Sequence, residues 1–62
     1  MEELSKAEVR VLKKMLLGKS MREIARELGL ARGTVLFHSA RIYAKLQVEG
    51  RADLLRLTED ES

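Results

Sequence analysis

Residues 19–46 constrain the fold of this chain more than any other stretch, because they read as two helices joined by a tight turn. Ser20 and Glu23 have the spacing of a capping box, which predicts that a helix begins directly after Ser20. Gly29 is the residue best able to adopt a left-handed conformation, so it predicts the end of that helix. The two predicted helices cover residues 21–28 and 32–46, the arrangement of a helix-turn-helix.

Each of these two predicted helices has one apolar face. At about 100° per residue, the inward side chains are Ile24, Ala25 and Leu28 in the first helix and Val35, Ser39, Ile42 and Leu46 in the second. The small Ala25 leaves room for two helices that cross steeply. Both faces should therefore share one core.

The segment before the helix-turn-helix predicts another helix. Ser5 and Glu8 repeat the capping-box spacing, so this helix should run over about residues 6–17, and Gly18 should end it. Its inward side chains are predicted to be Val11, Leu12, Met15 and Leu16. The exposed side of this helix should be basic.

The segment after the helix-turn-helix predicts a short fourth helix at residues 51–57, reached through a connection at residues 47–50. No segment predicts a strand. Because every loop is short, we expect a single all-α domain over residues 1–62, ordered at about residues 4–58. The acidic tail at residues 59–62 is expected to be disordered.

The charge of the chain is unevenly distributed. The net charge is only +2, but residues 10–45 hold nine basic and two acidic residues, a local charge of +7. This basic region coincides with the predicted helix-turn-helix, as a surface that faces nucleic-acid phosphates requires. An ordinary solvated helix surface is the alternative reading.

Several classes of function find no support in the sequence. The chain has no cysteine and one histidine, and no pairing of a base with a nucleophile, so we expect neither an enzyme nor a metal site. We expect no cofactor and no small-molecule ligand. No apolar run is long enough to cross a bilayer, so we expect no membrane association and a cytoplasmic location.

Three groups of residues resemble the LuxR/FixJ-type, or GerE-like, DNA-binding domain. They are Leu4, Ser5, Glu8, Val11 and Leu12, then Gly18, Ser20, Glu23, Ile24, Ala25, Leu28, Gly29 and Leu30, then Thr34, Val35, His38, Ile42, Lys45, Leu46 and Val48. The resemblance runs from about residue 4 to residue 57. It implies a four-helix domain of a transcriptional regulator, with the third helix in the major groove of duplex DNA. Such domains commonly follow a sensing domain, so the chain is either a stand-alone regulator or part of a longer one.

The outer face of the third helix should meet the DNA bases. Its residues are Leu36, Phe37, Ala40 and Arg41, and the resemblance implies the first three as base-facing positions. All three lack the hydrogen-bonding groups frequent in the family, although apolar side chains can pack on thymine methyl groups. Arg41 is the only member of this set able to read guanine.

The residues expected to bind DNA phosphates are the cations and helix starts around the groove. They are Lys19, Ser20, Met21, Arg22, Arg32, Thr34, His38 and Lys45. For Thr34, capping of the third helix is an alternative role. For His38, packing against the core is the alternative. Ala31 replaces the usual serine cap, at a cost of about 1 kcal/mol of helix stability.

Two further predictions concern protein partners. The resemblance implies that the fourth helix covers the first and pairs with its copy, so we expect a homodimer interface at Leu54, Leu55 and Leu57. The rival to DNA binding is a protein-interaction module in which Leu36 and Phe37 contact RNA polymerase or another regulator. The basic region favours DNA, whereas the apolar outer face favours a protein.

Overall fold

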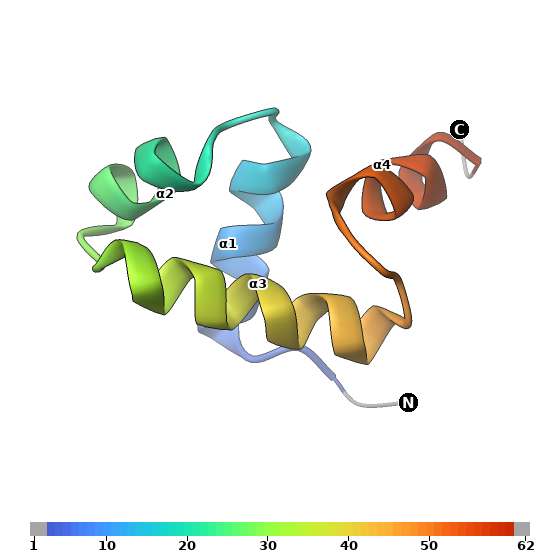
Figure 1. Cartoon of the computed structure of the whole chain (residues 1–62), viewed down its shortest axis with the longest axis horizontal. Helices are drawn as coiled ribbons and strands as arrows, with labels where there is room; N and C mark the ends of the chain where they lie inside the picture. The colour runs from blue at the N-terminus through green and yellow to red at the C-terminus, as the bar shows by residue number, and fades with distance from the viewer. Residues whose placement is uncertain (1–2, 61–62) are drawn as a thin grey trace.

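A computed structural model describes residues 3–60, and the side chains through residue 57. It contains four α-helices, α1 (Lys6–Leu16), α2 (Met21–Leu28), α3 (Arg32–Leu46) and α4 (Arg51–Asp60). In Figure 1, α1 crosses behind the middle of α3, while α2 and α4 lie over its amino- and carboxyl-terminal ends. The predicted all-α helix-turn-helix fold is confirmed. Within residues 3–60, no helix is long and apolar enough to cross a membrane.

Both predicted capping boxes form, and they set the first residues of α1 and α2. The Ser5 hydroxyl accepts a hydrogen bond from the Glu8 N–H (3.2 Å), and Glu8 Oε1 accepts one from the Ser5 N–H (2.8 Å). Ser20 and Glu23 exchange the same two bonds at 3.2 and 2.9 Å. Each pair satisfies two backbone donors that a helix start leaves without partners.

Left-handed residues follow three of the helices, and two of them, Gly18 and Gly29, were predicted to end a helix. Gly18 has a φ of +82° after α1, which ends at Leu16, one residue before the predicted end. Gly29 has a φ of +67° after α2, as expected, and the next N–H, that of Leu30, bonds to the Ala25 carbonyl at 2.9 Å. Gln47 repeats this arrangement after α3 with a φ of +59°. No local pattern predicted a left-handed Gln47, because residues with a Cβ rarely adopt this conformation. As predicted from its methyl side chain, Ala31 makes no side-chain cap at the start of α3.

One small core holds the four helices together. Its buried apolar residues are Val11, Met15, Ile24, Ala25, Val35, Ile42 and Leu54. The inward faces predicted for α2 and α3 are confirmed, with Leu28 and Leu46 partly buried. The polar Ser39 is buried as predicted, and its hydroxyl donates to the Leu36 carbonyl at 2.8 Å. The prediction for Leu16 is wrong, since its position at the edge of the α1 wheel leaves it exposed.

The fourth helix differs from its prediction in length and in what it buries. It continues to Asp60, because no glycine or proline interrupts the chain after Leu57, so residues 59 and 60 of the predicted tail are helical. Residues 61 and 62 of that tail lie outside the described residues. Leu54 is only 2% exposed and completes the core of a single chain. Its prediction as a dimer-interface residue is therefore wrong.

Arg51 attaches the start of α4 to the end of α1. Its Nη2 donates to the Met15 carbonyl at 2.9 Å and also to the Lys19 carbonyl. Carbonyls at the end of a helix lack partners within that helix and attract cations, so this contact stabilises the α1 end. Sequence reasoning missed it, because nothing local distinguishes Arg51 from the other basic residues.

Candidate nucleic-acid interface

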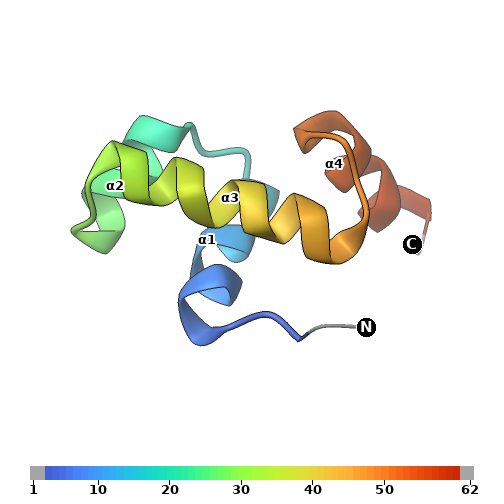
Figure 2. The same ribbon diagram turned by 60° about the horizontal axis from the view of Figure 1, so that its bottom comes forward.

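The four predicted base-facing residues lie together on the side of α3 that turns away from the core. Phe37 is 58% exposed and Leu36 is 49% exposed, and Ala40 and Arg41 are also exposed. Figure 2 shows α3 in front of the other helices, with one side uncovered along its length. A helix with a free side of this kind has the geometry needed to enter a major groove.

Arg41 is held by two contacts at one edge of this outer face. Its Nε donates to Glu8 Oε2 at 3.0 Å, and its guanidinium carbon lies 5.6 Å from the centre of the Phe37 ring. The side chain nevertheless remains 50% exposed. Arg41 is therefore anchored near its middle while its end stays open to solvent.

Glu8 is the buried centre of a charged cluster between α1 and α3. Its side chain is 2% exposed, and Oε1 accepts a 2.7 Å hydrogen bond from Lys45 Nζ. The hydrogen bonds from Lys45, from the Ser5 backbone and from Arg41 lower the pKa of Glu8 from 4.5 to about 2. The carboxylate is thus ionised at neutral pH and has a partner on each oxygen.

Lys45 was predicted to bind a DNA phosphate, but its side chain points into the protein. Its side chain is only 11% exposed, and its ammonium also donates to the Glu3 carbonyl at 3.3 Å. A phosphate could reach this ammonium only by displacing a buried carboxylate that depends on it. The structure therefore contradicts the assignment of Lys45 to phosphate binding.

The lowered pKa of Glu8 predicts a pH-dependent contribution to stability. The ionised side chain stabilises the folded chain above pH 4.5, and this stabilisation is lost as the pH falls from 4.5 to about 2. We expect Glu8→Gln to melt at a lower temperature than the unmodified chain at pH 7. The difference should shrink as the pH falls through this window, as followed by circular dichroism. A difference that does not change with pH would contradict the assignment.

Lys19 is paired at the surface with a residue of α2. Its Nζ lies 2.9 Å from Glu27 Oε2, and Lys14 Nζ lies 2.7 Å from the other oxygen of the same carboxylate. These contacts raise the pKa of Lys19 and lower the pKa of Glu27. Surface ion pairs contribute little to stability, so Lys19 can exchange Glu27 for a phosphate.

The other cations of the predicted phosphate set have no ion pair within the part of the chain whose side chains are described. Arg22 and Arg32 are exposed, near the starts of α2 and α3. Thr34 is also exposed, and its hydroxyl makes no hydrogen bond among the described side chains, so its alternative role as a helix cap is wrong. Ser20 caps α2, and Met21 next to it is partly buried.

His38 lies partly buried beside the outer face of α3. Its ring centre is 5.9 Å from that of Phe37. Its Nδ1 is buried and has no hydrogen-bond partner within the described residues. A phosphate can therefore reach this side chain only at Nε2.

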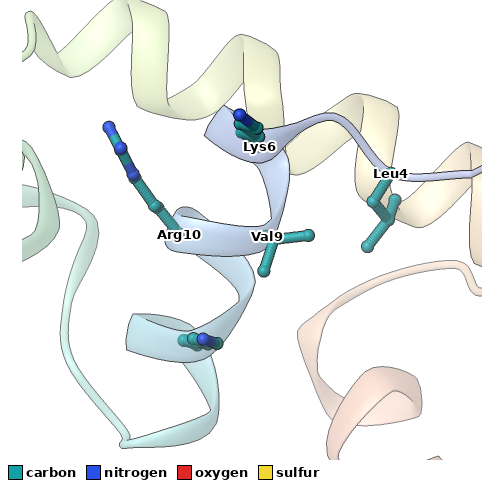
Figure 3. A pocket seen from close by; sticks show the side chains of 5 residues that line it. Leu4, Lys6, Val9 and Arg10 are labelled. Carbon is teal, nitrogen blue, oxygen red and sulfur yellow. The ribbon is translucent and has the colours of Figure 1, made fainter.

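A second basic region lies on the outer side of α1. A shallow hollow there is lined by Leu4, Lys6, Val9, Arg10 and Lys13 (Figure 3). Lys6, Val9, Arg10 and Lys13 stand on the side of α1 opposite to the core residue Met15, whereas Leu4 precedes the helix and packs against the core. The hollow is thus separate from the outer face of α3.

Comparison with known proteins agrees with this geometry. The family described as bacterial regulatory proteins of the luxR family (GerE) matches residues 2–58, nearly the whole chain. No curated protein and no solved structure matches the chain. The matched residues include all of α1, α2 and α3 and the outer face of α3. The chain therefore belongs to the luxR family of bacterial regulatory proteins, as a helix-turn-helix DNA-binding domain.

Proposed function

We propose that the chain regulates transcription by inserting α3 into the major groove of duplex DNA. The observation that carries this proposal is the uncovered side of α3, flanked by cations that are unpaired or only weakly paired. The proposed base-facing residues are Leu36, Phe37, Ala40 and Arg41. The proposed phosphate-facing residues are Lys19, Ser20, Met21, Arg22, Arg32, Thr34 and His38.

The chemistry of the outer face supports weak discrimination among DNA sequences. Leu36 and Phe37 can pack on thymine methyl groups but cannot form the paired hydrogen bonds that identify guanine or adenine. Arg41 is the one base-facing side chain with donors for guanine. Most of the affinity should therefore come from phosphates.

We further propose that two copies pair through α4 when they bind DNA. Leu57 supports this, because it is 44% exposed one turn after the buried Leu54, so it extends the apolar side of α4 to the surface. A two-fold axis between two copies would place the two α3 helices about 34 Å apart, one turn of duplex DNA. A bacterial regulator meets DNA in the cytoplasm, so a cytoplasmic location goes with this proposal.

Titration against duplex DNA at several salt concentrations tests the proposal. Lys19, Arg22 and Arg32 are the cations placed to meet phosphates, so log K should fall with log salt at a slope of about −3 per chain. Fluorescence anisotropy with a labelled random-sequence duplex measures this slope. The absence of binding at low salt would refute DNA binding by this chain.

The exposed aromatic ring of Phe37 favours one rival, a protein-interaction module that contacts RNA polymerase or a regulator. Phe37→Ala separates the two functions. If α3 reads DNA, affinity should fall by about 1–2 kcal/mol, mostly at thymine-containing sites. If α3 binds a protein, affinity for RNA polymerase should fall by about 2–4 kcal/mol with DNA binding unchanged. Leu17→Ala is the matched control, because Leu17 is an exposed apolar residue that caps the end of α1, and it should change neither affinity.

A further inference from the structure

The contact between Glu8 and Arg41 joins the first turn of α1 to the proposed DNA-reading face of α3. These residues are 33 positions apart in the sequence. Glu8 is itself rigidly held, since Oε1 bonds both the Ser5 N–H (2.8 Å) and Lys45 Nζ (2.7 Å). Its remaining oxygen, Oε2, accepts from Arg41 Nε at 3.0 Å. A fixed acceptor of this kind fixes the side chain that donates to it.

The way Arg41 is held leaves its terminal nitrogens free. Of its five N–H donors, the one on Nε points to Glu8, and the Phe37 ring lies 5.6 Å from the guanidinium carbon. Neither Nη atom has a hydrogen-bond acceptor among the side chains and backbone of residues 3–57. Two parallel Nη donors match the O6 and N7 acceptors of one guanine in the major groove.

We infer that Glu8 is a positioning residue for base recognition, which fixes Arg41 so that its Nη edge reads one guanine in each half-site. This inference rests on the proposed DNA binding and adds a specific base to it. A free arginine samples many conformations, and only a few of them present both Nη donors to a guanine. Glu8 restricts the conformations of Arg41 in the free chain. Arg41 therefore loses less conformational entropy when it binds the correct base.

The test uses one pair of matched substitutions. Glu8→Gln keeps an amide oxygen for the Ser5 cap, but it loses the charge and the second acceptor that hold Arg41. Glu23→Gln makes the same change in the equivalent capping box of α2, where no arginine is bound. Any general effect of replacing a capping glutamate should appear in both variants.

The probe is a duplex selected from a random pool by the unmodified chain, with each guanine replaced in turn by 7-deazaguanine, which lacks the N7 acceptor. At one guanine of each half-site, the replacement should weaken the unmodified chain and Glu23→Gln about tenfold. It should weaken Glu8→Gln by about threefold or less, and it should have no effect on Arg41→Ala, which has no donor for N7. Affinity for random duplex should stay similar in all four proteins, because phosphates supply it.

Retention of the full tenfold effect in Glu8→Gln would overturn the inference. A larger guanine effect in Glu8→Gln would also overturn it, because Glu8 would then be withholding Arg41 from DNA. If Glu8→Gln does not fold by circular dichroism, NMR of the unmodified chain decides. The Arg41 Nε–H should exchange slowly with water both in the free chain and on the selected duplex, and fast exchange on the duplex would overturn the inference. Loss of binding to every duplex at low salt would instead refute the proposed function.

Discussion

Leu54→Glu is expected to unfold the domain. Leu54 is 2% exposed and completes the core from α4. Removing a buried leucine costs about 2–5 kcal/mol, and placing a carboxylate in the same apolar site adds the cost of burying an unpaired charge. A domain of 62 residues has a stability of only about 3–9 kcal/mol. Circular dichroism at 25 °C should therefore show loss of most of the helical signal.

Leu57→Glu is the matched control, since it makes the same substitution in the same helix at a residue that is 44% exposed. This variant should keep the native helical spectrum and a cooperative melt. If the chain pairs through α4, sedimentation should show a dimer for the unmodified chain and a monomer for Leu57→Glu. A folded Leu54→Glu would contradict the burial of Leu54. A monomeric unmodified chain at high micromolar concentration would contradict the proposed dimer.

Lys45→Ala should lower stability, whereas Arg22→Ala should lower DNA binding. Lys45 is the nearly buried partner of Glu8, so its loss leaves one oxygen of a buried carboxylate with only the Ser5 N–H. Arg22 is exposed and has no ion pair among the described residues, so its loss removes only charge. Lys45→Ala should thus change stability but not DNA binding, and Arg22→Ala should change DNA binding but not stability.

Two measurements separate the variants. Thermal melting should show a drop of several degrees for Lys45→Ala and almost none for Arg22→Ala. The salt dependence of duplex binding should show a slope smaller by about one for Arg22→Ala at temperatures where both proteins are folded, and no change for Lys45→Ala. The reverse pattern would mean that Lys45 leaves Glu8 and faces a phosphate when DNA binds.

The features that were predicted correctly from the sequence depend on local patterns. The two capping boxes predicted the first residues of α1 and α2, and Gly29 predicted the end of α2. The spacing of apolar residues predicted the buried faces of α2 and α3. Each of these signals acts over a few residues, because capping bonds join positions three apart and helical faces repeat every three to four. The family also followed from the sequence, since its motif is a set of such local positions in a fixed order.

The tertiary structure alone decided which partner each side chain meets. A helical wheel places Leu54 and Leu57 near the same face of α4. It does not show that Leu54 is buried in the core while Leu57 stays exposed. Similarly, the capping box identified Glu8, but its contacts with Arg41 and Lys45 span 33 and 37 residues. Such contacts depend on how α1 crosses α3, and no pattern within either helix specifies that crossing. For this reason the sequence placed Lys45 at the DNA, whereas the fold turns it inward to neutralise a buried carboxylate.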